Sequence, residues 1–117
     1  MKEVLKNRTK RFAIDCWHLC GKFPVTREYD AFCRQLIRCS SSVGANYRAA
    51  CRAKSDADFI HKLKIVEEEA DECMYFLEIF FEISQKEHQE IKRLLAEANE
   101  LLSIVVASIK TMRNRKS

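Results

Sequence analysis

The chain has 117 residues, with 21 Lys and Arg, 17 Asp and Glu, only two Gly and one Pro. This length suits a single domain, which we expect to span residues 1–117, and the 47% hydrophobic content excludes a disordered chain. So few glycines and prolines exclude an all-β fold, which needs frequent turns, and leave no glycine-rich phosphate loop. Long helices are the remaining fold class.

The formal net charge of +4 conceals a strong asymmetry along the chain. Residues 1–54 carry +8, residues 55–109 carry −8 and residues 110–117 carry +4. Such a division predicts that the two halves complement each other, within one chain or between chains. The basic half could equally face a nucleic acid.

The cysteines and the N-terminal sequence bear on the compartment. No apolar signal segment opens the sequence and no stretch approaches the ~18 apolar residues of a membrane span, so we expect a cytoplasmic protein with reduced thiols. Cys16 and Cys20 share a helix face and could in principle ligate a metal. Burial as small core residues is the favoured interpretation, and no cofactor is expected. The six cysteines are Cys16, Cys20, Cys33, Cys39, Cys51 and Cys73.

Apolar residues at helical spacing predict four helices, over residues 2–22, 27–53, 56–83 and 86–113. Pro24 ends the first helix, and Thr26 precedes the second. Small residues around Gly44 in the second helix would let another helix approach closely, or would break the helix there. Ser55 and Asp58 resemble a capping box for the third helix, and Ser84 and Glu87 have capping-box spacing for the fourth.

Short connections between four amphipathic helices favour antiparallel neighbours. The sequence therefore predicts an all-α fold, an antiparallel up-down-up-down four-helix bundle.

The 56–83 helix carries a second apolar stripe away from its core stripe. A helix that is apolar nearly all round must be covered on both sides, and an exposed apolar patch marks a partner surface. We therefore expect a homo-oligomer; the alternative is that this helix is wrapped by its own neighbours. The predicted interface residues are Ile65, Tyr75, Phe76, Ile79 and Ile83.

The 27–53 helix carries an arginine stripe opposite its apolar face. Arginine suits bidentate pairing with phosphate or carboxylate, and a basic stripe is typical of nucleic-acid binding. The alternatives are a solvated face, or pairing with the acidic 56–83 helix of a neighbouring subunit in a protein–protein interaction module with no nucleic-acid role. The candidate nucleic-acid-binding residues are Arg27, Arg34, Arg38, Arg48 and Arg52.

No catalytic constellation is visible in the sequence. His18, His61 and His88 lie on different helices, and a di-iron bundle would need paired Glu-x-x-His motifs. Asp58-Phe59-Ile60-His61 is a single approximate match. We therefore expect a protein that is not an enzyme.

Several motifs together resemble the bacterial four helix bundle protein family, whose members are related to proteins encoded in intervening sequences of 23S ribosomal RNA genes. The resemblance covers about residues 10–112. The motifs are Phe23-Pro24, Ser42-Val43-Gly44-Ala45-Asn46-Tyr47-Arg48, Ser55 with Asp58-Phe59-Ile60-His61-Lys62-Leu63, and Glu68-Glu69-Ala70 with Glu72 and Tyr75-Phe76-Leu77. Many members have Pro where this chain has Gly44.

The resemblance implies an antiparallel four-helix bundle and a ring-like homopentamer. Relatives include the accessory variability determinant of diversity-generating retroelements, which binds nucleic acid and a reverse transcriptase through a basic surface. RNA or DNA, a reverse transcriptase or another protein are therefore the partners that the resemblance suggests. It supplies no catalytic residues.

Overall fold

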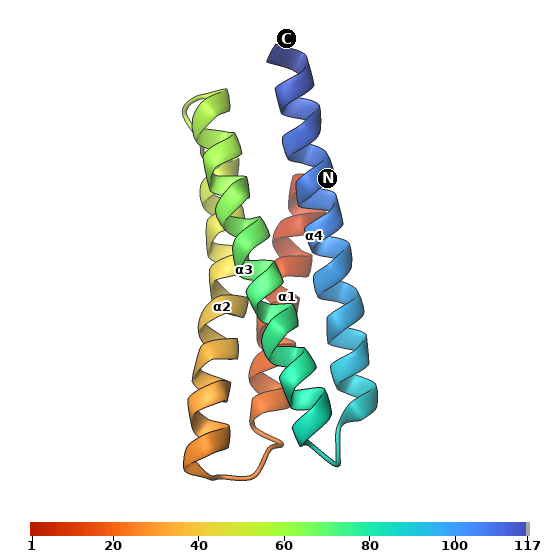
Figure 1. The fold of residues 1–117 in the computed structure, drawn as a ribbon. Coiled ribbons are helices and arrows are strands. Elements are labelled where there is room, and N and C mark those ends of the chain that lie inside the picture. The colour runs from red at the N-terminus through yellow and green to blue at the C-terminus, as the bar shows by residue number, and fades with distance from the viewer. Residues whose placement is uncertain (117) are drawn as a thin grey trace.

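The computed structural model describes residues 1–116, and Ser117 of the predicted domain lies outside them. Four helices make up the fold: α1 (Lys2–Cys20), α2 (Arg27–Cys51), α3 (Asp56–Ile83) and α4 (His88–Lys116). Successive helices run in opposite directions (Figure 1). The prediction of an all-α antiparallel bundle is confirmed.

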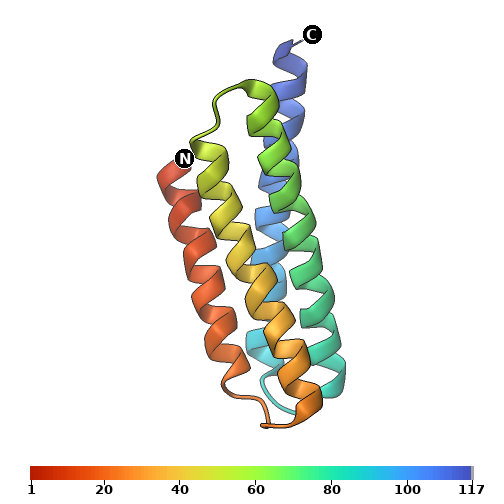
Figure 2. The ribbon, with the colours of Figure 1, turned by 90° about the vertical axis from the view of Figure 1, so that its left-hand side faces the viewer.

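The four helices form a closed ring of neighbours. Close approaches join α1 to α2, α2 to α3, α3 to α4 and α4 to α1, whereas no Cα atoms of the diagonal pairs lie within 8 Å of each other among the described residues. The bundle is elongated, measuring 49 × 21 × 20 Å. In Figure 2, α1 and α3 lie on either side of α2, and α4 lies at the back. No helix in this part of the chain has the length and apolar character to cross a membrane.

Helix ends agree with the sequence where a capping side chain is present. Thr26 Oγ1 accepts a hydrogen bond from Tyr29 N–H at 3.0 Å at the start of α2, and Ser55 Oγ accepts from Asp58 N–H at 3.1 Å at the start of α3. These bonds satisfy amide groups that have no partner inside the helix. α1 and α2 end two residues before the predicted positions, because the chain tightens there into i→i+3 hydrogen bonds such as Lys22 N–H to Leu19 carbonyl at 3.0 Å.

The capping box predicted for the fourth helix is wrong. Ser84 Oγ instead accepts from Lys86 N–H at 3.1 Å and donates to its carbonyl at 2.7 Å, which closes a local turn. Glu87 adopts a left-handed conformation with φ of 66°. α4 therefore begins at His88 rather than at residue 86, and it continues past the predicted end at residue 113 to Lys116.

The core runs along the bundle axis and is built from the predicted apolar stripes. Cys39 and Cys73 lie in it with no exposed surface, and their sulfur atoms are 3.2 Å apart across the α2–α3 contact. Among the most deeply buried large side chains are Phe12, Leu19, Leu36, Leu63, Leu77, Phe80, Ile91, Leu94 and Leu101. Cys16 is also fully buried, as the sequence indicated, and Cys20 is half-buried.

Small residues set the spacing of α1 and α2. α2 continues without a break through Gly44, which is buried against Thr9 of α1. A Cβ at Gly44 would lie 3.4–3.5 Å from Thr9 atoms. Thr9 is itself buried, and its hydroxyl donates to the Leu5 carbonyl at 2.8 Å. The prediction of a close helix approach at this point is confirmed.

Ion pairs supplement the α1–α4 contact, which is the least extensive of the four. Arg8 of α1 holds Glu97 of α4 through two bonds, from Nε at 3.0 Å and from Nη2 at 2.6 Å. Arg93 of α4 reaches back to Asp15 of α1 at 2.9 Å. Both pairs lie at the edge of the core, so they orient the two helices where apolar burial is smaller.

The Gly44 site generates the first prediction. Gly44→Ala raises the free energy of unfolding by up to ~1 kcal/mol, because alanine favours the helix and its Cβ meets Thr9 at an ordinary contact distance. Gly44→Leu lowers it by about 1–3 kcal/mol, because the longer side chain wedges the helices apart. Urea denaturation measures both, with Ala45→Leu as the control at an exposed neighbour. An unchanged midpoint for Gly44→Leu contradicts the close approach.

Candidate nucleic-acid interface

All five arginines of the predicted stripe are exposed, four of them on α2 and Arg52 directly after its last residue, but their surroundings differ. Arg27 opens the helix beside Glu28, with the charged groups 3.6 Å apart. Arg52 caps the other end, roughly 37 Å away at 1.5 Å per residue. The stripe therefore extends over the whole helix and does not form one compact site.

Arg38 is neutralised within the chain. Its guanidinium pairs with Glu69 at 3.2 Å and with Glu72, both on α3. The hydrogen bond with Glu72 is the main cause that raises the pKa of Arg38 above its ordinary value. The alternative considered from the sequence was pairing with the acidic helix of a neighbouring subunit. At Arg38 the carboxylates instead come from α3 of the same chain.

Three other arginines, Arg34, Arg48 and Arg52, make no ion pair within residues 1–116. At 100° per residue, Arg38 and Arg48 project about 80° apart, on either side of the direction of Arg34. Arg38 therefore leans towards α3, and Arg48 leans towards α1. This angular spread determines which arginines reach the carboxylates of α3 and which remain without an ion pair.

Arg48 meets lysines of α1 that the sequence analysis did not select. A cavity of about 240 Å³ between α1 and α2 is lined by Lys6, Lys10 and Arg48. Small residues, including Ala13 and Gly44, also line it. Lys6 also pairs with Glu3 at 3.5 Å, whereas Lys10 makes no ion pair among the described residues. The i, i+4 spacing of Lys6 and Lys10 indicates in the sequence that both lie on one face of α1, but it does not show whether that face lies next to α2.

We call the surface formed by Lys6, Lys10, Arg34, Arg48 and Arg52 the α1/α2 basic face. Along the same groove lies a second cavity of about 390 Å³. Its lining includes Trp17, which is 61% exposed, together with Ile14 and Ile37. The groove thus joins a cationic part to an apolar part.

The predicted oligomer interface on α3 is partly exposed and partly used by the monomer. Tyr75 is 59% exposed and Ile83 is 49% exposed, whereas Ile65, Phe76 and Ile79 are half-buried. Phe76 packs edge-on against Phe32 of α2 at 5.7 Å between ring centroids. Exposed acidic residues of α3, including Glu68, Asp71 and Glu78, share this side of the molecule.

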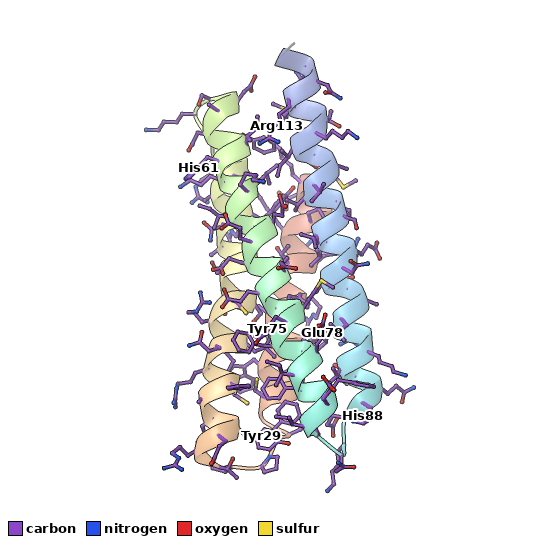
Figure 3. All side chains as sticks on the ribbon, in the orientation of Figure 1. Tyr29, His61, Tyr75, Glu78, His88 and Arg113 are labelled. Carbon is purple, nitrogen blue, oxygen red and sulfur yellow. The ribbon has the colours of Figure 1, made fainter. Side chains whose placement is uncertain are left out.

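The histidines occupy separate places. His61 lies near the start of α3 and His88 at the opposite end of the bundle, as Figure 3 shows. His88 Nε2 is 2.5 Å from the Ser84 carbonyl and its ring stacks on Phe81, which gives it a structural role. Among the described residues, no three Asp, Glu, His or Cys side chains are placed to hold a metal ion.

The buried thiols are poor nucleophiles. Burial raises the pKa of the Cys16 thiol to about 12. The pKa of Cys73 is raised by its hydrogen bond to Cys39 and by burial, and that of Cys20 mainly by burial. Thiolate, the reactive form, is therefore scarce at these positions at neutral pH.

The structure defines a small all-α bundle with one basic groove and one acidic, partly apolar helix. The model of the 23S rRNA-intervening sequence protein family matches residues 2–107. The chain belongs to this family.

A solved structure of a protein with unknown function from the S23 ribosomal protein family of Bacteroides thetaiotaomicron VPI-5482 is similar throughout. It shares 30% sequence identity with a TM-score of 0.82, over 94% of this chain and 99% of that chain. Among curated proteins, none matches this chain.

The in-chain pairing of Arg38 generates the second prediction. Arg38→Gln lowers the free energy of unfolding by about 0.5 kcal/mol, because the ion pair that it removes is half-exposed, and high salt reduces the difference. The matched change Arg34→Gln removes no ion pair and leaves stability within about 0.3 kcal/mol. Urea denaturation at low and high salt checks both; equal effects of the two variants contradict the assigned pairing.

Proposed function

We propose that this protein is a non-enzymatic, homo-oligomeric bundle that associates with RNA through the α1/α2 basic face. Phosphate groups would contact Arg48, Arg52 and Lys10, with Arg34 further along the helix. The observation that carries the proposal is that four of the five cations on this face have no carboxylate partner in the described chain, whereas Lys6 pairs with Glu3. The four are Lys10, Arg34, Arg48 and Arg52. An uncompensated basic surface attracts a phosphate backbone and releases its counterions on binding.

The distribution of carboxylates around α2 supports this proposal. α3 directs Glu69 and Glu72 at Arg38 but leaves the side of α2 that faces α1 uncompensated. Arginine suits this task because its planar guanidinium can engage phosphate through two hydrogen bonds. The proposed face has one exposed aromatic residue, Trp17, in the adjoining cavity. Backbone contact is accordingly the main proposed mode, and base stacking is secondary.

The third prediction concerns RNA affinity. Arg48→Glu combined with Arg52→Glu weakens binding of a single-stranded RNA at least tenfold at low salt, because attraction to two phosphates becomes repulsion. The slope of log affinity against log salt also becomes shallower by roughly 0.7 for each phosphate that is no longer neutralised. Fluorescence anisotropy at several salt concentrations measures both quantities.

Arg27→Glu is the matched control, because Arg27 lies at the far end of α2 beside Glu28. It should change affinity less than twofold. RNA affinity that is absent at low salt, or that is unaffected by the Arg48 and Arg52 reversals, would falsify the RNA proposal. Loss of the assembly on charge reversal, with no RNA binding by the parent protein, would favour a protein–protein interaction module instead.

We infer a homo-oligomer from the apolar surface of α3. Tyr75 and Ile83 expose large apolar areas, and such areas on one helix face are typical of a partner surface. The pentamer implied by the family resemblance would have about five times the 13.7 kDa mass of one chain.

The fourth prediction tests this interface. Tyr75→Glu combined with Ile79→Glu should convert the oligomer to monomers, because two carboxylates would be buried without partners. These positions are preferable to Phe76, whose ring also packs on Phe32 within the monomer. Light scattering after size exclusion gives the mass, and circular dichroism checks that the helices persist.

Val106→Glu serves as the control, because Val106 is a similarly exposed apolar residue on α4. It should leave the mass unchanged. A parent protein that runs as a monomer at all concentrations would overturn the oligomer proposal. A variant that keeps the parent's oligomeric mass would move the interface away from this part of α3.

A further inference from the structure

One end of the bundle holds a cavity that neither the basic face nor the α3 surface uses. α1 has 19 residues, whereas α3 has 28 and α4 has 29. Beyond Lys2, the turn between α2 and α3 and the last turns of α4 therefore face each other across an unfilled space. This end cavity has a volume of about 400 Å³, within the roughly 300–1,000 Å³ range of small-molecule sites.

The lining of the end cavity combines apolar, positively charged and acidic side chains. Phe59 of α3 and Met112 of α4 supply apolar surface, and both are half-buried. Lys2 of α1 and Arg115 of α4 supply positive charge, and Asp56 at the start of α3 supplies a carboxylate. These five residues come from three helices, so only the folded bundle brings them together.

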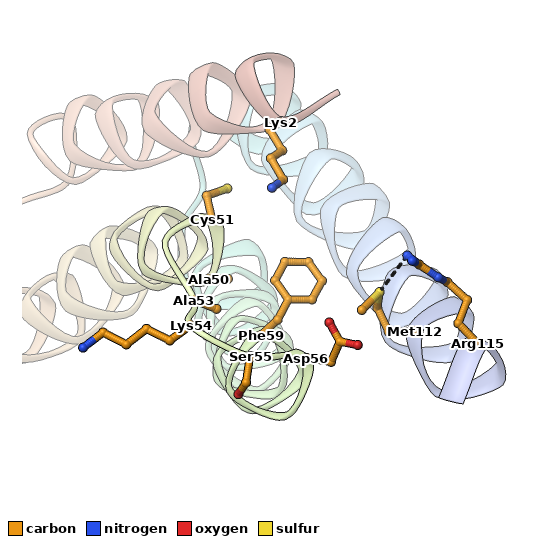
Figure 4. Close-up of a pocket in the computed structure, with 10 residues that line it drawn as sticks. All are labelled: Lys2, Ala50, Cys51, Ala53, Lys54, Ser55, Asp56, Phe59, Met112 and Arg115. Atoms are coloured by element: carbon orange, nitrogen blue, oxygen red, sulfur yellow. Dashed lines mark hydrogen bonds between the residues drawn. The ribbon is translucent and has the colours of Figure 1, made fainter. Parts of the chain in front are cut away.

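The side-chain directions divide the cavity into parts (Figure 4). The Lys2 ammonium points towards the ring of Phe59, and the Asp56 carboxylate lies between that ring and Met112. The Arg115 guanidinium stays at the α4 side, where it contacts the Met112 sulfur at 3.6 Å. Lys54 extends away from the other charged groups.

We propose that the end cavity binds one ribonucleotide unit, with the base on Phe59, the ribose hydroxyls on Asp56 and the 5′-phosphate between Lys2 and Arg115. Aromatic rings stack on bases of any sequence, and a carboxylate is a common acceptor for ribose hydroxyls. The cations and the carboxylate leave a net positive charge at the opening, which suits a monoester phosphate. The unit is a free nucleotide or the phosphorylated end of an RNA strand.

This inference deepens the proposed RNA association and rests on it only for the strand-end form of the ligand. The end cavity is a separate site from the α1/α2 basic face, because the cavities at the two places have no lining residue in common. It would recognise a terminus, whereas the basic face would hold the backbone of any strand. The 2′-hydroxyl contact would favour RNA over DNA at this site.

The fifth prediction is tested with adenosine 5′-monophosphate as the probe. As the nucleotide is added, the amide NMR resonances of residues 50–59 and 112–115 should shift, and the shifts should reach saturation. 2′-Deoxyadenosine 5′-monophosphate should bind at least threefold more weakly, because it lacks one hydroxyl for Asp56. Inorganic phosphate should bind at least tenfold more weakly, because it has no base for Phe59.

Variants assign the three contacts. Phe59→Leu, which preserves apolar packing, should weaken the nucleotide at least fivefold, and Lys2→Gln should weaken it about threefold. Asp56→Ala should remove the preference for the ribose over the deoxyribose form. Lys10→Gln, in the other cavity, is the matched control and should leave nucleotide affinity unchanged. Absence of saturable shifts at residues 50–59, or equal affinity for Phe59→Leu and the parent, overturns the inference.

The source of the nucleotide is decided by two oligoribonucleotides that differ only in a 5′-phosphate. Tighter binding of the phosphorylated strand, abolished in Phe59→Leu, identifies a strand end; no difference between them identifies a free nucleotide. The two proposals fail separately. If the nucleotide shifts persist but the Arg48 and Arg52 reversals leave RNA affinity unchanged, only the end-cavity proposal stands. If the protein binds RNA through those arginines but shows no nucleotide shifts, only the basic-face proposal stands.

Discussion

The close contact between Thr9 and Gly44 governs the arrangement of the surface as well as of the core. Because Gly44 has no side chain, only the small side chain of Thr9 lies between α1 and α2 there, and the two helices come close together. The same approach places Lys10 and Arg48 on the two rims of one groove. A bulkier residue at position 44 would widen this groove and separate the charges, so packing and electrostatics depend on one small-residue contact.

Charge compensation is uneven around the bundle, and this unevenness has a geometric cause. An arginine stripe on a helix covers an arc, so residues at its two edges face different neighbours. Arg38 at one edge meets the carboxylates of α3, and Arg48 at the other meets the lysines of α1. The ion pairs of Arg38 contribute to the α2–α3 contact. The edge of the stripe at Arg48 remains positively charged and can attract a phosphate backbone.

Unequal helix lengths provide the other distinctive feature. The three longer helices leave the turn between α2 and α3 open beside the last turns of α4. Residues distant in sequence, Lys2, Phe59 and Arg115, line the resulting end cavity. The opposite end is closed by aromatic packing, in which Phe23 stacks on Phe80 at 4.4 Å and the Tyr29 hydroxyl donates to the Ile83 carbonyl at 3.3 Å. The two ends of the bundle thus differ in character.

The sequence by itself determined the number and type of helices, the buried stripes and the caps at Thr26 and Ser55, because periodicity and capping are local properties. It misplaced the start of α4, since Ser84 closes its own turn and Glu87 adopts a left-handed conformation. Only the tertiary structure decided that Arg38 is neutralised, that Lys6 and Lys10 join Arg48, and that Lys2, Phe59 and Arg115 share a cavity. These outcomes depend on which helix faces lie against each other, and a linear pattern specifies the face of one helix without naming its neighbour.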